Sequence, residues 1–453
     1  MWLLLMLGHQ IARRGTPLTP ALGRMLLFWS LFALAQSIGT MTAYIIHDRH
    51  DPVWFDHDIL AYCLVGAVSC FSVIGPDAGA RLHRVAWIVA AVGSASLALQ
   101  LAGAYGLIGV ALSHPWYWDR FRGWSENPAQ LAFVCLAIGL LALYLVETAV
   151  GHGRKVAAIA FIILPIFVGL LTKTGAFTLS LALTIPIVAA LKSWTWLTSS
   201  EPRMMLRASL AGIIVLALPL TVLAAIPFST AVAGHTITIA DDLSKDHGKS
   251  RGKEAALRFK LWREAWSRGV HSGMLGLGPG PHVAIPPSIV VGRAGEAGRT
   301  NVSPHPQVNA VPNFEAHNTP LDLFLQGGLI AAFCFFWIAT SALSRAWRAR
   351  SAGLVAVLCS LLVFGMLMLI IRYPIFWFVI ALCLTADFGP YRHRRQWRRV
   401  RSGRGATILP RSGSGPFARR IRGARSIVSR PQRRTNAAIW QTVADTACGR
   451  LPA

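Results

Sequence analysis

The chain has 453 residues, of which 54% are hydrophobic and only 14% are charged. Soluble domains carry about 25% charged residues, so this composition excludes an ordinary soluble enzyme. The formal net charge of +25 raises the question of a nucleic-acid partner, but its distribution along the chain argues against one.

The apolar residues are gathered in long blocks instead of being spread along the chain. A bilayer core is about 30 Å thick and needs roughly 20 apolar residues per helix, because lipid cannot satisfy bare backbone groups. The sequence therefore predicts an all-α polytopic membrane protein with about ten transmembrane helices. The predicted blocks are residues 25–46, 58–76, 85–106, 128–148, 156–172, 174–191, 207–233, 319–343, 352–371 and 373–389.

The N-terminal segment, residues 1–24, is predicted to be a remnant followed by a cytoplasmic stretch. Its apolar run, Trp2 to Leu7, is too short to span a bilayer, and the positive residues follow the run. A signal peptide has the reverse order and a cleavage site. We interpret the run as part of a truncated first helix.

The C-terminal segment, residues 391–453, is predicted to be a basic, disordered cytoplasmic tail. After Tyr391 the chain holds sixteen arginines, one aspartate and no lysine, together with many Gly, Ser and Pro residues. Such a composition cannot bury a core. A basic tail directly after a membrane helix is typical of binding to anionic membrane lipid, and its sequence contains no recognisable nucleic-acid-binding module.

Loop charges orient the predicted helices, because short cytoplasmic loops carry an excess of Lys and Arg. With the tail inside, every short inside loop is basic and the short outside loops hold fewer cations. The same alternation places residues 234–318 outside as one large periplasmic loop, since long loops cross regardless of charge. This loop separates the membrane helices of residues 25–233 from those of residues 319–390.

The large loop contains the stretch KEAALRFKLWREAWSRGVHSGMLGLGPGPHV. From Lys253 to Arg268 its apolar spacing predicts a helix, on which Arg258 and Trp262 share one face. The following GLGPGP predicts a tight, stiff turn. An amphipathic helix lying on the membrane surface, with its tryptophans at the interface, is an alternative interpretation.

His317 stands immediately before the next membrane helix, in the stretch NFEAHNTPLDLFLQGGLIAAF. Asn318 or Thr319 can cap that helix through a side-chain oxygen. A lone histidine at a helix start is more often structural than chemical. The residues alone therefore leave open whether His317 is a polar cap or a reacting group.

Three further stretches are RFRGWSENPAQLA from Arg120, LLTKTGAFTLSLAL from Leu170 and RYPIFW from Arg372. Together with RFKLWREAW, GLGPG and AHNTPLDLFLQGGLI, they resemble the O-antigen ligase and polymerase superfamily of bacterial membrane proteins. The resemblance covers roughly residues 25–390. It implies a glycosyltransferase-C-like fold in the bacterial inner membrane, with the active site facing the periplasm.

The resemblance also implies an activity. Family members move a glycan from undecaprenyl diphosphate by inverting transfer, without a metal or other cofactor. The acceptor is the lipid A core in ligases, or a second glycan repeat in polymerases. The TKTG turn has Lys173 where ligases carry arginine, which is similar to the exopolysaccharide polymerase branch.

The resemblance assigns candidate roles to individual residues. A diphosphate leaving group develops negative charge that preorganised cations can stabilise, and a histidine can accept the proton of a sugar hydroxyl. A lysine at the turn keeps a point charge but loses the planar fork of arginine. The candidate catalytic residues are His317, Arg258 and Lys173, and the candidate substrate-binding residues are Arg120, Arg122, Trp262, Asn318 and Arg372.

Two alternatives compete with this hypothesis. The first outer loop reads HDRHDPVWFDHD, and its histidines with Asp56 and Asp58 could hold a divalent metal, although an ordinary polar loop is the simpler interpretation. A polysaccharide transporter or lipid-linked oligosaccharide flippase is the second alternative. Carriers place ionisable residues inside the bilayer and often show inverted repeats, whereas the predicted helix interiors here are nearly free of charge.

Overall fold

The computed structural model describes residues 19–47, 52–109, 115–117, 120–125, 127–197, 250–284 and 313–386. All of them belong to one compact unit, residues 1–394. The predictions for the N-terminal remnant, the apolar block 207–233 and the basic tail concern segments that lie wholly or largely outside the described residues. The division of the chain into membrane and periplasmic segments also stays a prediction.

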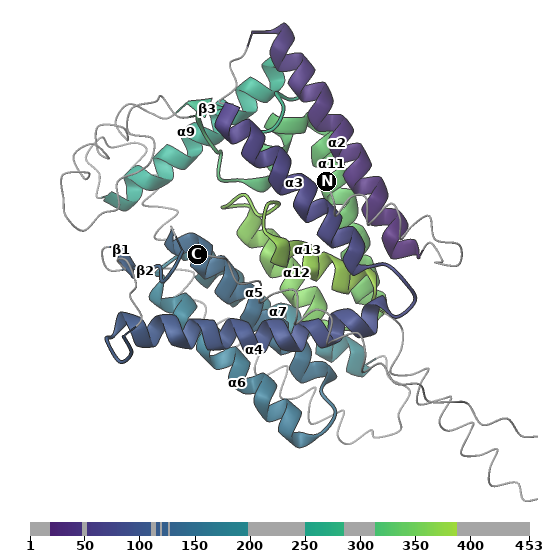
Figure 1. Cartoon of the computed structure of the whole chain (residues 1–453), viewed down its shortest axis with the longest axis vertical. Coiled ribbons are helices and arrows are strands. Elements are labelled where there is room, and N and C mark those ends of the chain that lie inside the picture. Colours follow the sequence, from purple (N-terminus) through teal and green to yellow (C-terminus); the bar gives the residue numbers. More distant parts are fainter. Residues whose placement is uncertain are drawn as a thin grey trace, which may run out of the picture. The chain divides into compact units, whose positions relative to one another are not determined.

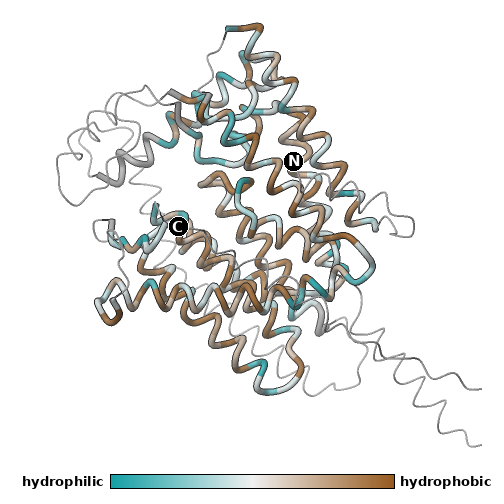
Figure 2. The backbone as a smooth tube through the Cα atoms, in the orientation of Figure 1, coloured by the Kyte–Doolittle hydropathy of each residue, from teal (hydrophilic) through white to brown (hydrophobic). Residues whose placement is uncertain are grey.

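The described part of the chain is mostly helical, as predicted for a polytopic membrane protein (Figure 1). Seven of its helices are long and apolar enough to cross a bilayer, and Figure 2 shows hydrophobic residues along them. Two shorter apolar helices follow. The long helices are α2 (Pro20–Ile45), α3 (Pro52–Ser72), α4 (Ala78–Ala104), α5 (Pro128–Thr148), α6 (His152–Leu171), α7 (Gly175–Leu197) and α11 (Thr319–Arg348), and the short ones are α12 (Ala352–Gly365) and α13 (Pro374–Leu384). The predicted count of ten stays a prediction.

Helix α5 lies at the centre of one group of helices and contacts α4, α6, α7 and α12. Small residues permit this close packing, because membrane helices gain contact area where their backbones approach. Gly139, for example, faces Pro165 and Ile166 of α6. In a second group of helices, α2 contacts α11 and α3 contacts α13.

One end of the first group is fixed by Glu147, at the end of α5. Its carboxylate accepts hydrogen bonds from the backbone N–H groups of Ala352 (3.2 Å) and Gly353 (2.7 Å) at the start of α12. It also forms an ion pair with Lys192 near the end of α7. A carboxylate at a helix N-terminus satisfies unpaired N–H groups and complements the helix dipole. The start of α5, the start of α7 and the end of α12 therefore lie at the opposite end of this group, toward the candidate site.

The structure differs from the predicted continuous helix over 352–371. Helix α12 ends at Gly365, and residues 366–373 form a non-helical connector before α13. Pro374 explains part of this break, because a proline disfavours helical geometry in the residue before it. The carbonyl groups of Met366, Leu367 and Met368 accept hydrogen bonds from side chains of other segments. Irregular backbone between membrane helices needs such partners.

Helix α11 is also interrupted, at Gly327 and Gly328. Gly328 has φ +64°, a conformation that costs little only for glycine. The carbonyl oxygens of Leu325 and Gln326 accept hydrogen bonds from the N–H groups of Leu277 (2.8 Å) and Gly278 (2.7 Å). The predicted GLGPGP turn therefore enters the break in α11, a relationship that the apolar block 319–343 did not indicate.

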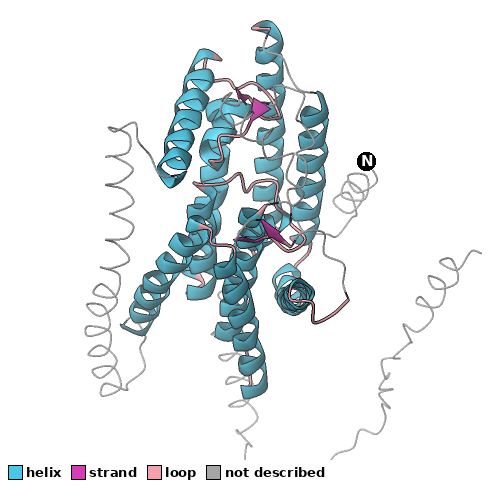
Figure 3. Ribbon diagram, turned by 90° about the vertical axis from the view of Figure 1, so that its left-hand side faces the viewer, coloured by secondary structure: helices cyan, strands magenta, loops and turns pink. Residues whose placement is uncertain are grey.

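The large predicted loop contributes helix α9 (Ser250–His271), which includes the predicted Lys253–Arg268 helix. Strand β3 (Val283–Ala284) pairs antiparallel with β4 (Asn313–Phe314), while β1 (Trp116–Tyr117) pairs with β2 (Arg120–Phe121). Figure 3 shows these two strand pairs among the helices. The buried residues beneath α9 form a small separate core, made of Ala43, Leu261, Ala265, Leu277, Val283, Ala316 and Leu325. This core places α9 against the start of α11.

Candidate active site

The loop between β4 and α11 carries His317 in an unusual backbone conformation. His317 has φ +52°, which is uncommon for a residue with a side chain and requires support from the surrounding structure. That support comes from Asp322, whose carboxylate accepts hydrogen bonds from the N–H groups of Ala316 (2.7 Å) and Asn318 (3.1 Å). The backbone on both sides of His317 is therefore fixed by one buried carboxylate.

The cap of α11 is Asn318 and not His317. The side-chain oxygen of Asn318 accepts a hydrogen bond from the N–H of Leu321 at 3.1 Å, the expected N-cap arrangement. The side chain of His317 is about one third exposed. The capping role therefore belongs to the neighbouring residue, and a chemical role for His317 stays a prediction.

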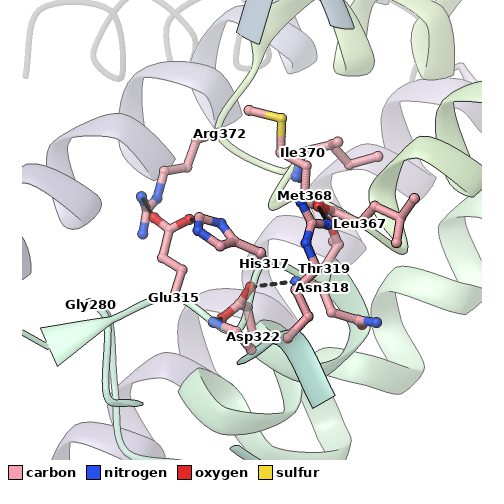
Figure 4. Close-up of polar contacts among 12 residues, drawn as sticks. Gly280, Glu315, His317, Asn318, Thr319, Asp322, Leu367, Met368, Ile370 and Arg372 are labelled. Atoms are coloured by element: carbon pink, nitrogen blue, oxygen red, sulfur yellow. Dashed lines mark hydrogen bonds and ion pairs between the residues drawn. The ribbon is translucent and has the colours of Figure 1, made fainter. Parts of the chain in front are cut away.

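Side chains at the start of α11 hold the connector between α12 and α13. The Asn318 amide donates to the carbonyl of Met366 at 3.0 Å, and the Thr319 hydroxyl donates to the carbonyl of Met368 at 2.6 Å. The same hydroxyl accepts from the N–H of Ile370 at 2.9 Å. These contacts bring the connector beside the His317 loop, as Figure 4 shows.

Helix α9 contacts the same region through both predicted residues of its Arg-xxx-Trp motif. The Arg258 guanidinium donates to the carbonyl of Leu367 in the connector at 3.3 Å. The Trp262 indole N–H donates to the carbonyl of Ala316, directly before His317, at 3.0 Å. Trp262 was predicted as a substrate contact. In the structure its one side-chain N–H donor is bound to the loop that carries His317.

Arg372 lies between two carboxylates from distant segments. Its guanidinium forms ion pairs with Asp58 of α3 and with Glu315 of the histidine loop. Burial alone would lower the pKa of the Arg372 guanidinium, but the negative charges of Glu315 and Asp58 outweigh it and raise the pKa well above its ordinary value. Arg372 was predicted as a substrate contact, and in the structure it joins three segments of the site.

Glu315 is placed between Arg372 and His317 (Figure 4). One of its carboxylate oxygens pairs with Arg372, and the other lies 3.9 Å from Nδ1 of His317. This second distance is that of an ion pair and is longer than a hydrogen bond. Glu315 was not among the predicted site residues, although it stands only two residues before His317.

Lys173 follows α6 in the turn before α7 and also has a left-handed backbone, with φ +50°. It stands at the opposite end of α7 from Lys192, which pairs with Glu147. Halfway along α7, the Thr184 hydroxyl lies 2.7 Å from the Ser360 hydroxyl of α12. Lys173 therefore lies toward the end of the bundle where α12 passes into the connector that Arg258 contacts.

Arg120 and Arg122 belong to the hairpin of β1 and β2, just before α5. Arg122 is buried, and its backbone N–H donates to the carbonyl of Pro115 at 2.9 Å. Near the start of α5, the ring of Phe133 packs against Tyr373 of the connector, with centroids 5.0 Å apart. The hairpin therefore lies at the end of α5 that faces the connector. The contacts around His317 come from other segments.

The carboxylate of Asp58 belongs to the cluster considered as a metal site, and the structure gives it different partners. It is fully buried, and besides Arg372 it lies 3.1 Å from Nδ1 of His57. Within the described ranges, no group of three or more His, Cys, Asp or Glu side chains is arranged to hold a metal ion. His50 and Asp51 of the same loop lie outside those ranges.

A cavity of about 780 Å³ lies between α2 and α3, and its lining is mainly apolar. Toward the site it reaches Tyr62, whose hydroxyl donates to the side-chain oxygen of Gln326 at 2.8 Å. The Gln326 amide in turn donates to the carbonyl of Gly280 in the glycine-rich turn at 3.1 Å. An apolar cavity at the membrane helices therefore adjoins the polar cluster around Arg372.

The fold defines the class first: this is a multi-pass helical membrane protein. A family model described as O-antigen ligase matches residues 158–336 of the chain. The matched segment runs from α6 to the middle of α11 and includes Lys173, Arg258 and His317. This match confirms the resemblance to the O-antigen ligase and polymerase superfamily. No curated protein matches the chain.

Proposed function

We propose that this protein transfers an undecaprenyl-diphosphate-linked glycan at the periplasmic face of the bacterial inner membrane. It would act as an O-antigen ligase or as an O-antigen or exopolysaccharide polymerase, with the lipid A core or a second glycan repeat as acceptor. The observation that carries this proposal is that the loop holding His317 lies beside the connector that Arg258 binds. Both His317 and Arg258 belong to the segment matched by the O-antigen ligase model.

In the proposed reaction, an acceptor hydroxyl attacks the anomeric carbon of the donor glycan. The hydroxyl oxygen forms the new glycosidic bond and its proton passes to His317, while the bond from the anomeric carbon to the phosphate oxygen breaks. The lipid diphosphate leaves with the electron pair, and the configuration of the anomeric carbon is inverted. Histidine suits this task because it can exchange a proton near neutral pH.

Arg258 and Lys173 are the proposed cations for the diphosphate. A guanidinium carries five N–H donors in a planar fork, a geometry that matches the oxygens of a phosphate group. Fixed cations in a poorly hydrated site stabilise developing charge far better than cations in bulk water. Arg120 and Arg122 extend this cationic side from the hairpin before α5.

The cavity between α2 and α3 supports a lipid-linked donor. The lipid of the donor is joined to the reacting carbon through only the diphosphate, so it must lie close to the site. The apolar lining of the cavity suits a hydrocarbon chain, and its end at Tyr62 adjoins the Arg372 cluster. We propose that this cavity receives part of the polyprenyl chain.

A carrier is the competing function, and the buried charges argue against it. Asp58, Asp322 and Arg372 belong to one cluster around the His317 loop and not to a path through the bundle. Carriers place such groups along the route of the substrate or coupling ion. The clustering of charge around one histidine therefore favours a reaction site.

The decisive test is transfer from purified lipid-linked glycan in liposomes, in the presence of a chelator. We expect the wild-type protein to remain active and His317→Ala to lose nearly all transfer, because general-base catalysis contributes about 10²- to 10⁴-fold. Transfer by His317→Ala at the wild-type rate would refute the proposed role of the histidine. Loss of wild-type activity with chelator, restored by Mg²⁺, would favour a metal-dependent reaction instead.

A further inference from the structure

We infer that Glu315 is a positioning residue for His317, and that Arg372 and Asp58 hold Glu315 in place. This inference rests on the proposed function and adds a carboxylate, a guanidinium and a second carboxylate to the histidine. The four side chains come from three segments: α3, the loop before α11, and the connector between α12 and α13.

The two oxygens of the Glu315 carboxylate have different partners. One oxygen is engaged by Arg372, while the other faces Nδ1 of His317 at 3.9 Å. This contact becomes a hydrogen bond if the two groups move closer, and contacts of catalytic groups often tighten only when substrate binds. A proton held on Nδ1 by Glu315 leaves Nε2 as the atom that accepts the proton of the acceptor hydroxyl.

Glu315 and His317 are held relative to each other by contacts to the backbone of their loop. Asp322 binds the N–H groups of Ala316, which lies between Glu315 and His317, and of Asn318, which follows His317. The backbone that carries both side chains is therefore fixed. Trp262 fixes the same peptide segment through the carbonyl of Ala316. The two side chains therefore approach from a rigid loop, and little further ordering is needed.

The charges of Asp58, Glu315 and Arg372 also act on His317. Asp58 and Glu315 share the single positive charge of Arg372, so these three side chains together carry a net charge of −1 when both carboxylates are ionised. Nearby negative charge favours the imidazolium that forms when His317 takes a proton. Asp58 binds Nη2 of Arg372 while Glu315 binds Nη1, so the guanidinium charge is divided between the two carboxylates.

The test compares kcat and KM of Glu315→Gln with the wild type in the liposome assay. Glutamine keeps the size of glutamate but removes its charge, so the imidazolium loses its stabilisation. We expect kcat to fall about tenfold or more, within the range of general-base effects, while KM for the lipid-linked donor changes less than about twofold. Glu315→Asp, which keeps the charge with a shorter reach, should recover part of kcat.

A double-mutant cycle shows whether Glu315 acts through the histidine. In a His317→Gln background, Glu315→Gln should change kcat by less than about twofold, because the group it positions is already absent. Asp58→Asn should lower kcat in the same direction as Glu315→Gln. The matched control is Glu264→Gln, whose carboxylate pairs with Arg268 of the same helix, α9; this substitution should leave the rate unchanged.

Each result has a defined meaning. An equal loss of kcat in both backgrounds, or a rise in KM alone, would overturn the positioning role and make Glu315 a structural or substrate-binding residue. Wild-type transfer by His317→Gln would instead refute the proposed function of the histidine, whatever Glu315→Gln does. If Glu315→Gln is not recovered folded from the membrane, Glu315→Asp and Asp58→Asn decide the question through the same cycle.

Discussion

The backbone N–H of Leu329 donates to the carbonyl oxygen of Met274 over 3.0 Å, which joins a membrane helix to the glycine-rich turn after α9. The contact exists because α11 is broken one residue earlier, at Gly328. A helix interruption normally leaves buried backbone groups unpaired, which is costly in a membrane. Here the turn supplies partners on both sides of the break, so the turn and the helix determine each other's position.

The break in α11 leads to a prediction for Gly328→Ala. A Cβ at this position would collide with the backbone of Met274 and Leu275, and the residue already has a positive φ. We expect a loss of about 3 kcal/mol or more in the free energy of unfolding, together with loss of transfer. Thermal unfolding in detergent and the liposome assay measure both effects. Gly153→Ala, where a Cβ meets open space, should leave the protein stable; equal stability of both variants would contradict this account.

Lys173 is predicted to act as a cation for the diphosphate. Lys173→Ala should abolish transfer while the protein remains folded in the membrane, and Lys173→Arg should retain part of the activity because the charge survives with a different geometry. Initial rates with purified donor measure this difference. Lys155→Ala, an exposed lysine near the start of α6, serves as the control and should behave as the wild type. Full activity of Lys173→Ala would show that the lysine is only part of a turn.

The cavity between α2 and α3 is predicted to receive the polyprenyl chain. Cys63 is exposed and lines this cavity, whereas its neighbour Leu64 is exposed but outside the lining. Cys63→Trp should raise KM for the lipid-linked donor severalfold with little change in kcat, because it removes binding made equally before and during the reaction. Leu64→Trp should have no such effect. A similar KM for both variants would place the lipid chain elsewhere.

The membrane topology is predicted from loop charges and can be tested with two exposed positions. Leu107, after α4, should face the periplasm, and Val150, after α5, should face the cytoplasm. Cysteines placed there in a variant without Cys63 and Cys448 should differ in reaction with an impermeant thiol reagent on intact spheroplasts. Labelling of Leu107→Cys alone agrees with the proposal; labelling of Val150→Cys alone would put the candidate site on the cytoplasmic side.

The sequence by itself determined the class of this protein and indicated part of its candidate site. Apolar blocks long enough for a bilayer predict helices, because lipid gives the backbone no other way to satisfy its hydrogen bonds. Short motifs then indicated His317, Arg258 and Lys173, and the family match includes all three. Local patterns of this kind depend on neighbours along the chain, so they can be read without a structure.

Only the tertiary structure decided what surrounds the histidine. Asp58 and Arg372 are 314 positions apart, and no local pattern pairs them. Hydropathy averages over a window, so it also concealed the breaks in α11 and α12, where single residues depart from the helix while their neighbours stay apolar. Buried backbone and charged groups need partners, and in this protein those partners come from segments that only folding brings together.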